Sequence, residues 1–153
     1  MRIAFDLDGT LVPMFAGQFP AHCAGWTWAW PLREPLRSNA PALMRGLRAD
    51  GHDLWIYTSS LRSPARIRGL FLAHGVRLDG VVNALRHAGA TDGRASKYPP
   101  AFGIDLLIDD AEGVALEGTR HGFRVPQVLP GDDAWDRRVR DAVRALQAPA
   151  ASR

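Results

Sequence analysis

The chain has 153 residues, of which 46% are hydrophobic and 23% are charged, with a formal net charge of +3. This composition is ordinary for a globular protein and predicts a single domain over residues 1–150 with its own core. No apolar run approaches the roughly 20 residues of a membrane-spanning helix. The single cysteine, Cys23, excludes an internal disulfide and a cysteine-rich metal site. Asp6 and Asp8 interrupt the N-terminal apolar run, unlike in a signal peptide, so we expect a cytoplasmic protein with no membrane partner.

The pI of about 9.7 raises the question of nucleic-acid binding. The nearest basic cluster is Arg137, Arg138, Arg140 and Arg144, which alternate with apolar positions at helical spacing. These arginines are therefore expected on the solvated face of a helix, and we favour a small-molecule partner over nucleic acid. One compositional feature is sharper: the 19 basic residues include a single lysine, Lys97.

Apolar runs alternate with segments of helical periodicity along the chain. The predicted strands cover about residues 2–7, 53–57, 81–82, 104–108 and 123–128. The predicted helices cover about residues 39–49, 63–74 and 111–121, with a last helix from about 132 onward. Pro126 weakens the last strand and suggests that it lies at an edge or ends early. This order predicts a doubly wound, Rossmann-like α/β fold, with helices on both faces of a parallel five-stranded sheet.

The segment 12–38 is long for a connection between a strand and a helix. It contains three tryptophans at alternate positions, Trp26, Trp28 and Trp30, which share one face if the segment is extended. We interpret this segment as a short flap. Its apolar face is expected to pack on the domain itself or in a homo-oligomer, the alternative being a lid or substrate platform over the site. Residues 148–153 have the composition of a frayed tail.

Polar side chains follow the best-marked strands at the point where each strand ends. They are Asp6 and Asp8, then Thr58 and Ser59, and finally Asp109 and Asp110. In a parallel sheet these ends meet at one edge, where α/β folds bind their ligands. A concentrated set of carboxylates is costly without a cation, and Mg²⁺ favours a few carboxylates, waters and a substrate phosphate. Hydroxyls and the compact ammonium of Lys97 are suited to phosphate oxygens.

Four motifs resemble those of the haloacid dehalogenase-like (HAD) phosphohydrolase superfamily. They are FDLDGTL, LWIYTSS, SKYPP and LLIDDAEG, and they occur in the family's order over residues 3–113. The resemblance implies a HAD-like fold and a Mg²⁺-dependent phosphatase that uses an aspartyl-phosphate. Asp6 would be the nucleophile and Asp8 the general acid and base. Asp6, the backbone carbonyl of Asp8 and Asp110 would hold the metal, with Asp109 close by, directly or through water.

The same resemblance assigns the phosphoryl group to Thr58, Ser59 and Lys97. It also points to a departure, because many relatives carry a large cap domain that selects the substrate. Here the first insertion point offers only residues 12–38 and the second only residues 83–96. We therefore expect a capless or minimally capped member that acts on a small phosphomonoester, whose identity the sequence does not specify.

Three alternatives stay open at this point. A phosphotransferase or mutase would use the same aspartyl-phosphate, but a mutase usually needs a cap in which its intermediate reorients. A non-enzymatic phosphate-binding module, such as a receiver-like domain, normally carries its acceptor aspartate at the end of the third strand, not the first. A nucleic-acid end-processing protein is suggested by the high pI and predicts salt-sensitive binding to DNA or RNA.

Overall fold

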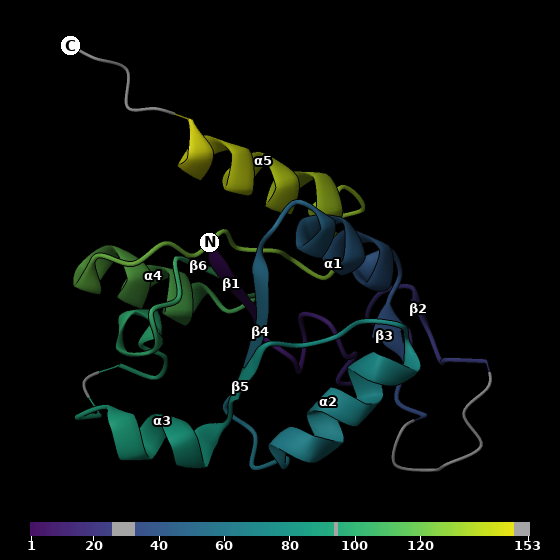
Figure 1. Cartoon of the computed structure of the whole chain (residues 1–153), viewed down its shortest axis with the longest axis horizontal. Coiled ribbons are helices and arrows are strands. Elements are labelled where there is room, and N and C mark those ends of the chain that lie inside the picture. The colour runs from purple at the N-terminus through teal and green to yellow at the C-terminus, as the bar shows by residue number, and fades with distance from the viewer. Residues whose placement is uncertain (26–32, 94, 149–153) are drawn as a thin grey trace.

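The computed structural model describes residues 1–25, 33–93 and 95–148, shown in Figure 1. Its central sheet has four parallel strands in the order β5-β4-β1-β6. These strands are β1 (Arg2–Phe5), β4 (Asp53–Tyr57), β5 (Gly80–Val82) and β6 (Leu106–Ile108). The chain builds outward from β1 through β4 to β5 and then returns to place β6 on the other side of β1. The switch point therefore lies at the carboxyl end of β1, where such folds bind ligands.

Helices cover both faces of this sheet, as the sequence predicts (Figure 1). One face packs against α1 (Ala40–Ala49), α2 (Pro64–Ala73) and α5 (Trp135–Gln147). The other face packs against the short 3₁₀ helix η2 (Pro99–Phe102) and α4 (Glu112–His121), while α3 (Ala84–Ala90) lies at the end of β5. Within the described residues, no helix is both long enough and apolar enough to cross a membrane.

Side-chain alternation along the strands explains the two cores. Ile3 and Phe5 of β1 point into the cluster with α1, α2 and α5, whereas Ala4 between them points into the cluster with α4. Local signals place the helix starts. Ser63 accepts a hydrogen bond from the Arg66 backbone N–H at 3.3 Å, which caps α2.

The prediction of a fifth strand at 123–128 is wrong, because this segment does not form a regular strand. This segment runs beside β6, where the Leu107 N–H donates to the Arg124 carbonyl at 3.1 Å, but it forms only one isolated bridge, between Gln127 and Asp109. Pro126 has no backbone N–H to donate, which interrupts the ladder at this border of the sheet. Helix α3 was not predicted. It has no buried residue, and the apolar stripe by which a helix is predicted is therefore missing.

Within the flap, residues 12–38, a small antiparallel pair forms between β2 (Ala21–His22) and β3 (Leu36–Arg37). Arg37 connects this pair to the loop before α5. The residue is buried, with 2% of its surface exposed. Its Nη2 donates to the backbone carbonyls of Leu129, Pro130 and Asp132 at 2.9, 3.1 and 3.2 Å. The predicted tryptophan face at positions 26, 28 and 30 lies outside the described residues.

The outer strand β5 carries a second arginine contact. The Arg86 Nη1 group donates to the Val81 carbonyl at 2.8 Å. Its guanidinium also lies over the ring of Trp55, 5.1 Å from the ring centre, and over Phe102 at 5.5 Å. The Arg86 side chain thus covers the outer edge of β5 and packs on the rings of Trp55 and Phe102.

Candidate active site

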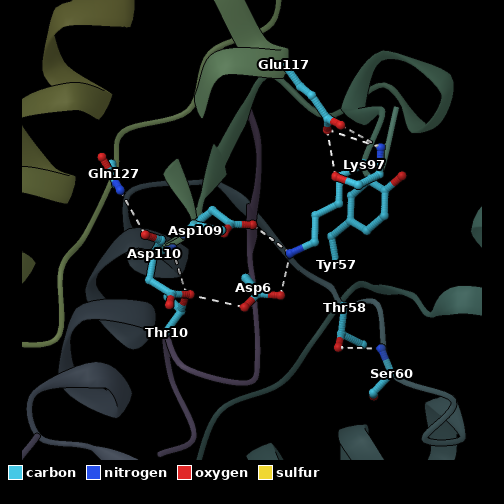
Figure 2. Close-up of polar contacts among 12 residues, drawn as sticks. Asp6, Thr10, Tyr57, Thr58, Ser60, Lys97, Asp109, Asp110, Glu117 and Gln127 are labelled. Carbon is cyan, nitrogen blue, oxygen red and sulfur yellow. Dashed lines mark hydrogen bonds and ion pairs between the residues drawn. The ribbon is translucent and has the colours of Figure 1, made fainter. Parts of the chain in front are cut away.

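The polar residues that follow β1 and β6 meet at the carboxyl edge of the sheet. Asp6 is the residue after β1, and its backbone N–H donates to the Ile108 carbonyl at 2.8 Å. Asp109 and Asp110 follow β6 directly. Because β1 and β6 are neighbours in parallel register, the three carboxylates are brought to one place (Figure 2).

Lys97 is the cation at the centre of this group. Its Nζ donates to Asp6 Oδ1 at 2.5 Å and to Asp109 Oδ2 at 2.6 Å. All three side chains are buried, with Lys97 4% and Asp109 1% exposed. A buried carboxylate is stable only when it is paired and hydrogen-bonded, and one ammonium here serves two of them.

The ionisation of Asp6 reflects this crowding. Burial raises the pKa of Asp6, Lys97 lowers it and the neighbouring Asp109 raises it, with a net pKa of about 7. For Lys97, burial works in the opposite sense, but the two carboxylates outweigh it and raise the pKa of the ammonium. Lys97 is therefore charged, whereas Asp6 exchanges its proton in the neutral pH range.

The loop that carries Lys97 is fixed on both sides of the lysine. Before it, Ser96 donates to Glu117 of α4 through both its backbone N–H, at 3.0 Å, and its hydroxyl, at 2.6 Å. After it, the backbone N–H of Tyr98 donates to the Tyr57 hydroxyl at 2.8 Å. These contacts hold the Lys97 backbone between α4 and the end of β4, so the side chain reaches the carboxylates from one direction (Figure 2).

Asp110 is fixed by the turn that follows β1. Its Oδ1 accepts a hydrogen bond from the Thr10 hydroxyl at 2.7 Å, and its backbone N–H donates to the same hydroxyl oxygen at 3.1 Å. Gly9, which follows Asp8, has φ +90°, and a Cβ there would lie 2.8 Å from Asp110 Oδ2. Glycine therefore permits both the backbone turn and the close approach of the carboxylate.

The donor set fits a hard divalent cation. One carboxylate oxygen from each of Asp6, Asp109 and Asp110 lies within 4.8 Å of the other two. Oxygen ligands in this number are what Mg²⁺ takes when waters and a substrate phosphate complete its shell. Asp109 is already engaged by Lys97 and by the Ala111 backbone N–H at 2.9 Å, which leaves Asp110 the more available of the two adjacent acids.

The other residues predicted for the site are arranged less tightly. Thr58 follows β4 and is buried, and its Oγ1 accepts a hydrogen bond from the Ser60 backbone N–H at 3.1 Å. Figure 2 shows Asp6 between the Thr58 side and the Asp110 side of the site. Ser59 is exposed at the rim. Asp8 is half-buried, and its carboxylate forms an ion pair with Arg62 at 2.7 Å.

Sequence reasoning missed Arg62. Its Nη1 contacts Asp8 Oδ1, and its Nη2 lies 3.2 Å from Glu34 Oε2 of the flap. Glu34 in turn pairs with Arg66 of α2 at 2.6 Å. The sequence does not predict this partner of Asp8, because the contact depends on the paths of two loops. A basic residue close after the strand-end hydroxyls was the available signal.

Comparisons with known proteins support the fold. No protein-family model and no curated protein matches the sequence. A solved structure of the Pnkp1/Rnl/Hen1 complex contains a chain similar to this one, with TM-score 0.56 and 18% identity over 86% of this chain and 46% of that chain. A structure of the Pnkp1/Rnl/Hen1 RNA repair complex gives TM-score 0.54 and 15% identity over 86% of this chain and 43% of that one.

The chain thus spans less than half the length of those two proteins. It spans nearly all of a third, the HAD domain of the effector protein Lem4 from Legionella pneumophila, which was solved as an inactive mutant. That match has TM-score 0.53 and 10% identity over 94% of this chain and 92% of the Lem4 domain. At these identities the likeness concerns the fold alone: the α/β fold of this chain is similar to that of the Lem4 HAD domain.

Proposed function

We propose that this protein is a Mg²⁺-dependent phosphatase that hydrolyses a phosphomonoester through an aspartyl-phosphate on Asp6. The observation that carries the proposal is the buried Lys97 ammonium, which joins Asp6 to Asp109 at the switch point of a HAD-like fold. A carboxylate at the end of β1 with a fixed cation beside it is arranged for attack on phosphorus.

In the first step, an Asp6 oxygen attacks the phosphorus, and the bond from phosphorus to the ester oxygen breaks. Asp8 donates its proton to the departing oxygen, so that an alcohol leaves. In the second step, water attacks the phosphorus of the aspartyl-phosphate, and Asp8 takes a proton from that water. Inorganic phosphate and free Asp6 are the products. The two acids therefore have different tasks, and their different surroundings, a buried Lys97 pair and a half-exposed rim, fit that division.

The metal assignment follows the donor set. Asp6, Asp110 and the backbone carbonyl of Asp8 would hold Mg²⁺, with Asp109 nearby. The bound ion supplies the positive charge that lets a carboxylate approach an anionic phosphoryl group. Lys97, together with the Thr58 hydroxyl and the exposed Ser59, would bind the phosphoryl oxygens on the other side of Asp6.

A small substrate is favoured over the alternatives. The regular structure in the described part of the flap is one short two-stranded pair, which is much smaller than the cap that a mutase usually needs. The arginines of α5 lie on a helix that packs over the sheet rather than at its carboxyl edge (Figure 1). The likeness to a chain of an RNA repair complex keeps terminally phosphorylated nucleic acid among the substrates to be tested.

The deciding experiment is a substrate screen with the wild type and an Asp6→Asn variant. Phosphorylated metabolites, nucleotides, phosphopeptides and a terminally phosphorylated oligonucleotide are incubated with Mg²⁺ or with a chelator. We expect Mg²⁺-dependent release of phosphate that Asp6→Asn abolishes while circular dichroism stays unchanged. Beryllium fluoride with Mg²⁺ is expected to bind the wild type at Asp6 and not the variant. Full turnover by Asp6→Asn, or in chelator, overturns the mechanism.

A further inference from the structure

The Arg62 side chain joins three segments at the mouth of the site. It contacts Asp8 in the loop after β1 and Glu34 in the flap, while its own backbone belongs to the loop after β4. The Arg62 and Asp8 side chains keep 26% and 35% of their surface exposed. The guanidinium is therefore accessible to a ligand that reaches Asp8 from outside.

When the Arg62 side chain turns toward such a ligand, Glu34 still has an ion-pair partner. Glu34 keeps Arg66 on its other oxygen, at 2.6 Å. The Glu34 oxygen nearer Arg62, Oε2, has no hydrogen-bond partner among the described residues, so the 3.2 Å contact is an unaligned ion pair. The Arg62 backbone stays in place, because buried Asn83 donates to the Arg62 carbonyl at 3.1 Å.

The position of Arg62 relative to the chemistry rests on the proposed function. If Asp8 protonates the departing ester oxygen, the group 2.7 Å from Asp8 lies on the leaving-group side of the phosphorus. Lys97 and Thr58 lie on the phosphoryl side. A guanidinium presents a planar fork that binds carboxylate or phosphate oxygens in pairs.

We propose that Arg62 is a specificity residue, which binds a second anionic group that the substrate carries close to its ester oxygen. The substrate class is therefore a phosphomonoester with a carboxylate or a further phosphate two or three bonds from the ester oxygen. Asp8 and Glu34 hold the guanidinium in position until the anionic group replaces them.

The test uses non-hydrolysable phosphonates, so that binding is measured apart from turnover. The probes are 3-phosphonopropionate, its uncharged amide and ethylene-1,2-diphosphonate, titrated calorimetrically at one fixed concentration of free Mg²⁺. The wild type is expected to bind the carboxylate about tenfold more tightly than the amide, as for one charge-assisted contact. The diphosphonate identifies which anion fits better, a carboxylate or a second phosphate.

Arg62→Ala is expected to bind 3-phosphonopropionate and its amide with nearly equal Kd. Arg62→Lys keeps the charge but loses the fork, so its preference should lie between those of Arg62→Ala and the wild type, and it decides the question if Arg62→Ala does not fold. The matched control is Arg66→Ala, which removes a neighbouring arginine that contacts Glu34 and should keep the wild-type preference.

Two failures are distinguishable. Equal binding of 3-phosphonopropionate and its amide by the wild type, no binding of either, or an unchanged preference in Arg62→Ala overturns the role of Arg62, while Asp6-dependent turnover would still support the phosphatase. Absence of Asp6-dependent turnover overturns the phosphatase. In that event a charge preference that disappears with Arg62→Ala still identifies Arg62 as the anion contact.

Discussion

Asp6 shows how one residue ties stability to function. Its carboxyl group is buried beside Asp109, and its pKa rises from the ordinary 3.8 to about 7 in the folded protein. The folded state therefore holds a proton that the unfolded state releases near pH 4. This contribution to the free energy of unfolding is fully present below about pH 4 and is lost as the pH rises through about 7.

We predict that, in a chelator, the melting temperature of the wild type falls relative to that of Asp6→Asn as the pH rises from 4 to 7. Asparagine resembles the protonated acid in shape and charge, so the variant removes this titration and keeps the remaining ones. Melting curves of both proteins at each pH measure the difference. A difference that stays constant over this range contradicts the raised pKa of Asp6.

At the scale of single residues, the sequence predicted that the polar side chains at the strand ends lie close together. The structure places Asp6, Asp109 and Asp110 together with Lys97, because parallel strands in adjacent register carry their end residues to one edge. Arg62 could not be predicted in the same way. Its contact with Asp8 spans 54 residues and depends on two loops, and loop paths follow no hydrophobic period.

At the scale of elements, α4 positions the lysine through a single side chain. Burial raises the pKa of Glu117, but the hydrogen bonds from Ser96 and from the Lys97 backbone outweigh it and lower that pKa. The carboxylate thus accepts these donors as an anion. It is the link between α4 and the loop that holds Lys97.

We predict that Glu117→Gln lowers turnover about tenfold, because misplacing a catalytic group by as little as ~1 Å can cost ~10²-fold. The melting temperature should change little, and amide exchange at Ser96 and Lys97 should become faster. Glu112→Gln is the control, since that exposed residue begins the same helix. Wild-type turnover and exchange in Glu117→Gln would show that other contacts suffice to hold the loop.

The predicted helices are confirmed where buried apolar residues recur at helical spacing. Helices α1 and α2 lie within a residue or two of their predicted bounds, because Leu43, Met44 and Leu47 in one and Ile67, Leu70 and Phe71 in the other face the core. The segment 123–128 failed as a strand because its apolar residues pack beside β6 while Pro126 interrupts the pairing. Hydrophobicity alone does not distinguish packing from pairing.

At the scale of the whole molecule, Arg37 joins the flap to the C-terminal part of the chain. It donates to three backbone carbonyls before α5, and its guanidinium lies 4.6 and 4.9 Å from the ring centres of Phe19 and Trp135. Burial lowers the pKa of Arg37, although nearby acids, with Asp132 foremost, oppose this. A homo-oligomer formed through the tryptophans of the flap stays a prediction.

We predict that Arg37→Lys lowers the free energy of unfolding by about 1–3 kcal/mol, because lysine is shorter and lacks the planar guanidinium that reaches these carbonyls and stacks on the two rings. Urea unfolding measures this change. Arg33→Lys, at an exposed position in the same flap, is the control and should match the wild type. If Arg37→Lys is as stable as the wild type, the flap is held by its apolar contacts rather than by this arginine.

The contact of Arg86, in α3, with the outer strand β5 bears on how the protein avoids aggregation. A bare strand border invites another chain to extend the sheet, which is a common route to aggregation. Here the Arg86 guanidinium occupies the outward carbonyl of Val81, and Pro126 offers no donor beside the opposite border. One edge of the sheet is thus covered by the Arg86 side chain, and the other by the segment 123–128, whose backbone hydrogen-bonds with Leu107 and Asp109. We therefore expect edge-to-edge pairing between molecules of this protein to be disfavoured, even though the sheet is only four strands wide.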